Sequence, residues 1–405
     1  MKITRGYKTE LDLTNKQKSA CIEHAGAARF AYNWALDRKK EAHSNGEKAP
    51  SAYALHRKLN ALKKTEFPWL YRVSKCAPQE ALRNADRAYD TFFRKILLKK
   101  KGKYKGKTGF PTYKKRTRAI GSFRLTGTIR VTGKTIRLPR LGILRLKEKG
   151  YLPGNTHILS AAVSEQAGRF FVSLQTEETL PVPDTTKTGA IGLDLGIKTL
   201  ATLSDRTLFK NPRPLKSALG RLRRLQRSLS RKRKGSRNRE KTKKKLAVLH
   251  FSIANIRKDA IHKLTSNVCK SHAFIAIEDL NVGGMLKNHH LAQAISDAGF
   301  GEIRRQLTYK ALWYNTRLVV IDRFFPSSKT CSVCGYIYSA LSLAERQWTC
   351  PACEVLHMRD ENAARTILLA ASSAERINAC GAESADNPVT DGETMPRLKQ
   401  EPNTL

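Results

Sequence analysis

The stretch Ala190-Ile-Gly-Leu-Asp-Leu-Gly196 places one acidic residue, Asp194, inside an apolar segment that is typical of a buried β-strand. A carboxylate in such a strand is costly unless it is paired or binds a metal ion. Two similar residues follow: Glu278 ends the apolar strand predicted at Phe274–Ile277, and Asp360 opens a predicted helix. Read singly, each carboxylate has an ordinary explanation as a salt bridge, a strand end or a helix cap.

Taken together, the three carboxylates predict a two-metal site for phosphodiester chemistry. Clustered carboxylates repel one another, and this repulsion would raise their pKa values if no cation were bound. Two Mg²⁺ ions about 3.5–4 Å apart would neutralise them and clamp the attacking and leaving oxygens. We expect Gly196, beside Asp194, to leave room for the substrate backbone because it has no side chain.

The composition indicates an acidic partner. The chain has 405 residues and a formal net charge of +42, and 40% of its residues are hydrophobic, which is enough for packed cores. At roughly 100–200 residues per domain, two to four domains are expected. No apolar run approaches the roughly 18 residues that span a bilayer, and the first residues lack a signal-peptide core. We therefore expect a cytoplasmic protein with no membrane association and with nucleic acid as its partner.

The cysteines predict one structural zinc site. Cys331-x2-Cys334 and Cys350-x2-Cys353 have the spacing of a four-thiolate zinc site, in which each sulfur lies about 2.3 Å from the ion. Such a site is closed, so its role is structural. The other four cysteines are scattered singly, which is the pattern of a reducing compartment and not of a disulfide framework. His357 could replace one ligand, although four cysteines suffice.

Two basic segments are candidates for binding nucleic-acid backbone. Ten of the 20 residues in Lys99–Arg118 are Lys or Arg, with aromatic residues between them, and 16 of the 33 residues in Arg213–Lys245 are Lys or Arg. Their cations would replace counterions, and the aromatic rings could stack on bases. A solvated linker is the alternative for the first segment. The candidate contacts are Lys103, Lys105, Lys107, Lys114, Lys115, Arg116, Arg223, Arg224, Arg227, Arg231 and Arg233.

Pattern changes along the chain divide it into segments. A first strand and a later group of short β segments predict a small antiparallel barrel, with the helical block between them as an insertion. An α/β region follows the barrel. The tail is rich in Pro and Gly and has an acidic excess, which predicts disorder. The expected segments are 1–14 (first barrel strand), 15–119 (helices and basic arm), 120–185 (barrel), 186–329 (nuclease, first part), 330–353 (zinc ribbon), 354–380 (nuclease, second part) and 381–405 (tail).

Several of these motifs, in this order, resemble the TnpB family of transposon-encoded RNA-guided nucleases, which is related to the type V CRISPR effectors. The similar motifs are Gly192-Leu-Asp-Leu-Gly-Ile-Lys198, Ile277-Glu-Asp-Leu280, the four cysteines and Arg359-Asp-Glu-Asn-Ala-Ala364. Residues 28–33, 295–299 and 325–328 also look like the family, so the resemblance covers nearly the whole chain except the tail. One departure is Met358, where an acidic or polar residue is expected.

The resemblance implies a fold and a set of site residues. The fold would be a multidomain α/β plus α+β protein, with an RNase H-like (RuvC) nuclease domain split by a zinc ribbon. An N-terminal wedge barrel would carry a helical recognition insertion. By motif position, the family's catalytic, magnesium-binding triad falls on Asp194, Glu278 and Asp360. Three neighbouring acids fit the motif positions less well: Asp279, Asp297 and Glu361.

The resemblance also implies the activity. The protein would bind a transposon-derived guide RNA and cleave complementary double-stranded DNA next to a short adjacent motif, using two Mg²⁺ ions and one structural Zn²⁺ ion. Lys75 and Gln79 are candidates for reading that motif, with an exposed helix start as the alternative. We expect a monomer with one RNA and leave a dimer open.

Two other functions are alternatives. A nuclease-inactive, RNA-guided repressor keeps the fold but lacks the acidic triad, whereas all three acids are present here. A DNA strand-transfer transposase is the other alternative, because RNase H-like folds also host strand transfer. A tyrosine transposase would need a two-histidine metal cluster near a nucleophilic tyrosine, and His289-His290 has no such setting in the sequence.

Overall fold

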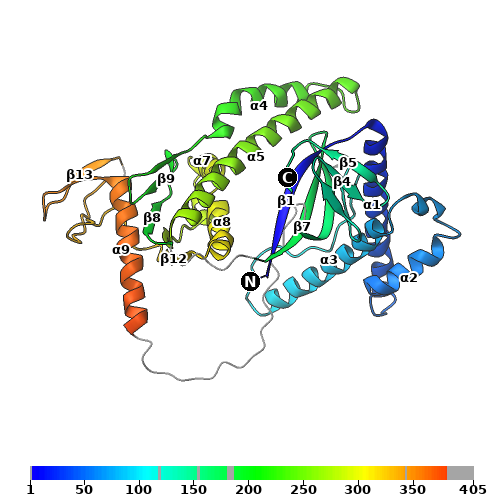
Figure 1. Cartoon of the computed structure of the whole chain (residues 1–405), viewed down its shortest axis with the longest axis horizontal. Coiled ribbons are helices and arrows are strands. Elements are labelled where there is room, and N and C mark those ends of the chain that lie inside the picture. The colour runs from blue at the N-terminus through cyan, green and yellow to red at the C-terminus, as the bar shows by residue number, and fades with distance from the viewer. Residues whose placement is uncertain (1, 117–119, 153–155, 180–186, 343, 381–405) are drawn as a thin grey trace. The chain divides into compact units, whose positions relative to one another are not determined.

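The computed structural model describes residues 2–116, 120–152, 156–179, 187–342 and 344–380. The tail 381–405 lies outside these ranges. The chain forms two compact units, one of Met1–Pro183 with Pro214–Ile256 and the other of Asp184–Arg213 with Arg257–Leu405 (Figure 1). Within the described ranges, no helix has both the length and the apolar character that crossing a membrane requires.

The first unit contains an antiparallel sheet of seven strands. Their order is β2 (Ser122–Leu125), β6 (His157–Gln166), β7 (Arg169–Thr179), β1 (Lys2–Asp12), β5 (Gly142–Leu146), β4 (Thr135–Leu138) and β3 (Arg130–Thr132). Because β1 lies between β7 and β5, the helices that follow β1 in the chain are inserted between strands of one sheet.

The inserted helices are α1 (Asn15–Ser44), α2 (Ala52–Leu62), the 3₁₀ helix η1 (Pro68–Arg72) and α3 (Cys76–Lys100). Thr14 begins α1 with a capping box: its hydroxyl accepts from the Gln17 amide at 3.3 Å, and the Gln17 side chain accepts from the Thr14 amide at 3.0 Å. Alanines such as Ala31 and Ala85 are fully buried and allow α1 and α3 to pack closely. The helical pair α4 (Pro214–Ser230) and α5 (Arg237–Ser271) also contributes to this unit, up to Ile256.

The second unit is built on a five-stranded sheet. Its order is β10 (Leu208–Lys210), β9 (Thr199–Leu203), β8 (Ala190–Asp194), β11 (Phe274–Glu278) and β12 (Arg317–Ile321). Strands β8, β11 and β12 are parallel, whereas β9 and β10 run antiparallel to their neighbours. Leu193 pairs with Ile277, so the next residue of each strand, Asp194 and Glu278, ends its strand at the same edge of the sheet.

The helices of this unit are the end of α5, from Arg257, and α6 (Val282–Met285), α7 (Ala292–Ala298), α8 (Phe300–Trp313) and α9 (Arg359–Cys380). Helix α8 begins at Phe300, after Gly299 has ended α7 in the left-handed conformation (φ +72°). Helix α9 packs on β8, where Gly192 is essential: a Cβ there would lie 2.0 Å from the Ala364 carbonyl oxygen.

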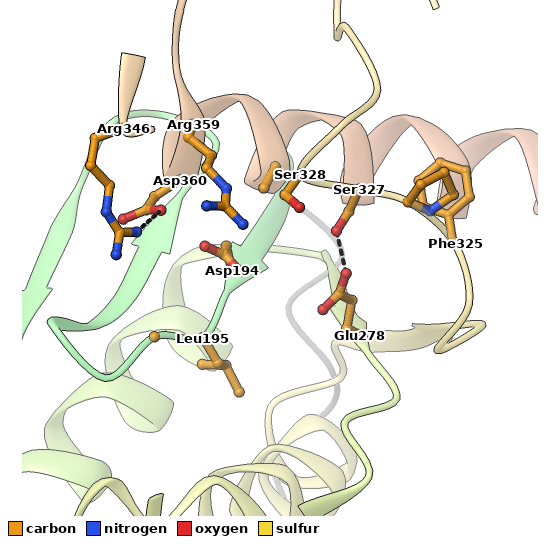
Figure 2. A pocket seen from close by; sticks show the side chains of 12 residues that line it. Asp194, Leu195, Glu278, Phe325, Ser327, Ser328, Arg346, Arg359 and Asp360 are labelled. Carbon is orange, nitrogen blue, oxygen red and sulfur yellow. Dashed lines mark hydrogen bonds and ion pairs between the residues drawn. The ribbon is translucent and has the colours of Figure 1, made fainter. Parts of the chain in front are cut away.

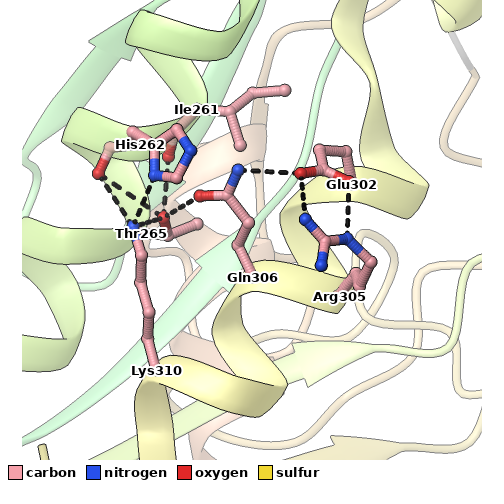
Figure 3. A network of polar contacts seen from close by, with 7 residues as sticks. All are labelled: Ile261, His262, Thr265, Glu302, Arg305, Gln306 and Lys310. Carbon is pink, nitrogen blue, oxygen red and sulfur yellow. Dashed lines mark hydrogen bonds and ion pairs between the residues drawn. The ribbon is translucent and has the colours of Figure 1, made fainter. Parts of the chain in front are cut away.

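A buried polar network joins the end of α5 to α8 (Figure 3). The Lys310 amine donates to the hydroxyls of Thr265 at 2.7 Å and Ser266 at 2.8 Å, and Thr265 donates to Gln306 at 2.9 Å. Burial lowers the pKa of Lys310 to about 8. The amine is therefore satisfied by hydrogen bonds but has lost much of its preference for the charged form.

A small hairpin precedes α9. Strands β13 (Gln347–Thr349) and β14 (Leu356–Met358) pair antiparallel, and β14 leads directly into the helix. Trp348 is buried in the hairpin, with its ring 5.7 Å from that of Tyr338 and 4.9 Å from that of His357. The tryptophan therefore packs inside the ribbon.

Candidate active site

The three predicted acids line one pocket of about 290 Å³ (Figure 2). Asp194 ends β8, Glu278 ends β11, and Asp360 lies in the first turn of α9. The parallel register of β8 and β11 brings the first two together. The packing of α9 on β8, which Gly192 permits, adds the third.

The electrostatics of this pocket favour a cation. Burial raises the pKa of Asp194 to about 7, and the negative charges of Asp360 and Glu278 act in the same direction. Burial also raises the pKa of Glu278, an effect partly offset by the Ser327 hydroxyl that donates to its Oε1 atom. Three carboxylates this close repel one another when they are ionised, and a bound divalent cation would relieve the repulsion.

The donor set fits Mg²⁺, although two of the carboxylates now have protein partners. Carboxylate oxygens are the ligands that Mg²⁺ prefers. Glu278 is bound by Ser327, and Asp360 lies 3.4 Å from the guanidinium of Arg346. To share an ion, the two side chains would turn from these partners toward Asp194.

Gly196 lines the same pocket, beside Asp194. A Cβ at this position would lie 2.9 Å from the Thr199 carbonyl oxygen, and the Gly196 amide donates to the Leu200 carbonyl at 3.3 Å. The chain's own turn between β8 and β9 therefore requires a glycine here, and the expectation that Gly196 also leaves room for substrate stays a prediction.

The three acids that fit the motifs less well do not line this pocket. Arginines bind each of them, which neutralises the carboxylates and fixes nearby elements. The pairs are Asp279 with Arg304 and Arg323, Asp297 with Arg257 at 2.8 Å, and Glu361 with Arg206 at 2.7 Å and Arg365 at 2.6 Å. Their ion pairs are consistent with structural roles.

Sequence reasoning missed two basic residues of the pocket, Arg346 and Arg359. The Arg359 amide donates to the Arg346 carbonyl at 2.9 Å, so the two arginines face each other at the open end of the β13–β14 hairpin. Arg359 is adjacent to Asp360 and could have been found from the motif alone. Arg346 lies 14 residues earlier, and only the pairing of the two strands places it here.

The four predicted zinc ligands also come together. Among the residues that the structure describes, they form the one group of three or more candidate ligands whose ligand atoms all lie within 4.8 Å of one another. Cys331 and Cys353, and likewise Cys334 and Cys350, have sulfurs 3.6 Å apart. Four sulfurs placed tetrahedrally at about 2.3 Å from zinc would be about 3.8 Å apart, so the cluster fits the ion closely.

His357 is a close neighbour of this cluster. Its Nε2 atom lies 3.0 Å from the Cys331 sulfur, and the ring is buried against Trp348. The histidine can therefore support a bound thiolate by hydrogen bonding while the four cysteines complete the coordination.

The candidate nucleic-acid contacts lie on the surface. Lys75 is exposed and Gln79 half-buried at the start of α3, and the preceding Ser74 amide donates to the Nε2 atom of buried His24 at 2.9 Å. All eleven basic candidates of the two cationic segments are exposed. None of the eleven forms an ion pair with another residue of the described ranges. Ten of them therefore have their charge available to phosphates, whereas desolvation lowers the pKa of the Lys114 amine.

The aromatic residues of the basic arm have structural contacts. Phe110 packs against Tyr89 and Phe92, with ring centroids 5.4 and 4.6 Å away, and the Tyr113 hydroxyl donates to Asp37 on α1. The Lys114 amine lies 4.1 Å from the centre of the Tyr32 ring. These contacts hold the described part of the arm against α1 and α3, so Phe110 and Tyr113 serve in docking the arm.

Comparisons with known proteins agree with the motifs. Residues 171–289 match a family model described as "Probable transposase", residues 300–367 one described as "Cas12f1-like, TNB domain", and residues 1–48 one described as "Helix-turn-helix domain". In the last range, the structure has strand β1 and the single long helix α1.

Two relatives match over most of their length. The chain is 37% identical over 384 residues to a protein of Streptomyces pristinaespiralis named "Putative RNA-guided DNA endonuclease". The aligned residues cover 94% of this chain and 91% of the relative. It is 33% identical to a protein of the same description, InsQ, from Escherichia coli (strain K12), over 100% of this chain and 99% of the relative. The chain therefore belongs to the TnpB family of transposon-encoded RNA-guided DNA endonucleases.

Similarity to solved structures is weaker. The structure of CasPhi-2 (Cas12j) bound to crRNA matches with a TM-score of 0.45 and 10% identity, over 91% of this chain and 98% of that chain. Because this TM-score is low, the family assignment depends on the sequence relatives.

Proposed function

We propose that this protein binds a guide RNA and cleaves complementary double-stranded DNA next to a short adjacent motif. The observation that carries the proposal is the meeting of Asp194, Glu278 and Asp360 in one pocket, on elements far apart in the sequence. The chain's family and the names of its relatives agree with this activity.

The three carboxylates would hold two catalytic Mg²⁺ ions. When bound, the ions would supply charge stabilisation to the phosphodiester group. The half-buried Asp194 lies between the other two acids in the view of Figure 2 and is suited to share both ions. Ser327 orients Glu278, and the guanidiniums of Arg346 and Arg359 give the pocket a positive side that can bind a phosphate oxygen.

The four cysteines would hold one structural zinc ion. Because zinc binding is coupled to the folding of small ribbons, the ion would fix the β13–β14 hairpin, whose last residue, Met358, lies two residues before Asp360. Zinc would thus support the pocket without taking part in the reaction.

The remaining segments have proposed roles in nucleic-acid binding. The seven-stranded sheet, formed from 1–14 and 120–185, would be the wedge barrel, and 15–119 its recognition insertion. Residues 186–329 and 354–380 would form the RuvC-like nuclease, interrupted by the ribbon 330–353. The exposed cations of the arm and of α4 would bind phosphates, Lys75 and Gln79 would read the adjacent motif, and one protein would act with one RNA.

Sequencing the RNA that copurifies with the protein tests the guide. That RNA would then be used to design a matching DNA duplex for cleavage in Mg²⁺. Asp194→Ala should lower the cleavage rate at least about 100-fold, because several kcal/mol of charge stabilisation would be lost, while RNA and target binding remain.

Asp259→Ala is the matched control, because this carboxylate is exposed on α5 and pairs only with Lys263 among the described residues. It should cut at the wild-type rate. Near-normal cleavage by Asp194→Ala would reject the assignment of the active site, and the absence of a copurifying RNA would reject the guide.

A further inference from the structure

We propose that Phe324 is a stacking platform beside the active site, which binds the face of an unpaired base in the DNA strand being cut. This inference rests on the proposed function and adds to it a residue that positions the substrate. Its occupant is a nucleobase freed from pairing, since a duplex hides the faces of its bases.

The first observation is the contrast between two adjacent phenylalanines. Phe324 is 86% exposed, more than any other large hydrophobic residue in the described ranges. Phe325 packs against a small core that includes Ile321 and Ile367. The half-buried Phe325 anchors the segment, whereas the ring of Phe324 contributes almost nothing to the core.

The second observation is that the backbone around Phe324 is held on both sides. The Phe324 amide donates to the Asp322 carboxylate at 2.7 Å, and the Phe325 amide donates to the Asp322 carbonyl at 3.2 Å. The preceding Arg323 binds Asp279, which follows Glu278 directly. These contacts fix the turn that presents the exposed ring.

The third observation is the distance along the chain to the pocket. Phe325 to Ser328 line the pocket wall, and Ser327 donates to Glu278. Because successive Cα atoms are about 3.8 Å apart, the Phe324 ring is attached one residue outside this wall. A base that stacks on it would belong to a nucleotide close to the phosphate in the pocket.

The chemistry of the ring suits this occupant. A phenylalanine face has no hydrogen-bonding atoms, so it can stack on any base without reading its identity. Such tolerance is required of an enzyme whose sequence specificity comes from a guide. The neighbouring cations, Arg346 and Arg359, can bind the phosphate while the ring holds the base.

The test combines single-turnover cleavage with crosslinking, both in the guide-loaded protein. Phe324→Ala should slow cleavage about 5- to 150-fold, the range expected for one stacked base, and Phe324→Trp should retain the rate. Phe324→Leu should lose most of it, because leucine is apolar but has no aromatic face. Leu312→Ala, which removes another exposed hydrophobic side chain of the same unit, should have no effect.

Abasic substrates show whether the effect depends on a base. One abasic position near the cut should slow the wild type by a similar factor and should not slow Phe324→Ala further. In the cleavage-deficient Asp194→Ala protein, 5-iodouracil at that position should photocrosslink to Phe324.

The outcomes separate the two proposals. Three results would overturn the platform alone, provided that the wild type cuts. They are a normal cleavage rate of Phe324→Ala, a normal rate of Phe324→Leu, and the same loss of rate at every abasic position that is tried. A crosslink at Phe324 in a protein that never cuts would support the platform and overturn the endonuclease. If the protein neither cuts the DNA nor crosslinks to it, the platform and the endonuclease activity would both be overturned.

Discussion

Replacing Gly192 with alanine should misplace the third carboxylate of the pocket. The new Cβ would lie 2.0 Å from the Ala364 carbonyl oxygen, and real Cβ contacts essentially never fall below 3.0 Å. Helix α9 or strand β8 must therefore move by at least about 1 Å. Neither the helix backbone nor the central strand can yield locally, so the shift is passed to Asp360, four residues before Ala364.

The structure sets the size of both effects. Overpacking a core costs about 1–3 kcal/mol, and a backbone contact this close belongs at the upper end. For a unit of this size, about 3 kcal/mol corresponds to a fall in melting temperature of about 6–12 °C. A misplacement of about 1 Å in a catalytic group costs about 100-fold in rate.

The assay is single-turnover cleavage of a matched duplex by the guide-loaded protein, with thermal unfolding measured in parallel. Gly301→Ala is the control, because this glycine lies in α8 of the same unit and a Cβ there would have no atom within 4 Å. It should leave cleavage unchanged and stabilise the protein by about 0.4–1 kcal/mol. Wild-type cleavage and melting in Gly192→Ala would refute the packing argument and the placement of Asp360.

Three further predictions follow from other parts of the chain. Cys350→Ser with Cys353→Ser should lose one equivalent of zinc by mass spectrometry and destabilise the ribbon; a folded double variant that keeps its zinc would exclude the site. The free energy of unfolding of the wild type should rise between about pH 8 and 10.5. Over this range Lys310 keeps its proton in the unfolded state but has released it in the folded state, so the penalty for burying its charge disappears. In chemical unfolding over this pH range, the free energy of unfolding of the wild type should increase by up to about 3 kcal/mol relative to that of Lys310→Met. A difference between the two proteins that does not change with pH would contradict the lowered pKa. A protein ending at Cys380, given guide RNA separately, should still fold and cut, because the acidic, Pro-rich residues beyond it can bury little apolar surface; loss of cleavage would make the tail functional.

The sequence predicted the parts of the pocket whose local pattern reflects their position. An acidic residue at the end of an apolar strand marks Asp194 and Glu278, because the ends of parallel strands meet at one edge of a sheet. The spacing of the cysteines likewise indicates a cluster, since each knuckle is a local turn. In both cases, the information lies within a few residues.

The features that were missed depend on long-range register. Arg346 enters the pocket only because β13 pairs with β14. The turn's own need for a glycine at position 196 was missed because its neighbour, the Thr199 carbonyl, is placed by a turn whose shape the sequence does not specify. The same limit applies to Phe110, whose packing against α3 could not be separated from an exposed role by composition.

The hairpin links the zinc cluster to the acidic pocket. Its turn is the knuckle Cys350–Cys353, and its open end carries Arg346 opposite Arg359. Like charges directly opposite each other on paired strands are destabilising, so an isolated hairpin would be pushed apart at this end. The carboxylates compensate for the repulsion: Asp360 pairs with Arg346, and the charges of both arginines oppose the rise in the pKa of Asp194. The arginines and the acids are therefore each unfavourable alone and stable together, and an ordered knuckle, which fixes the register of β13 and β14, keeps them within reach of one another.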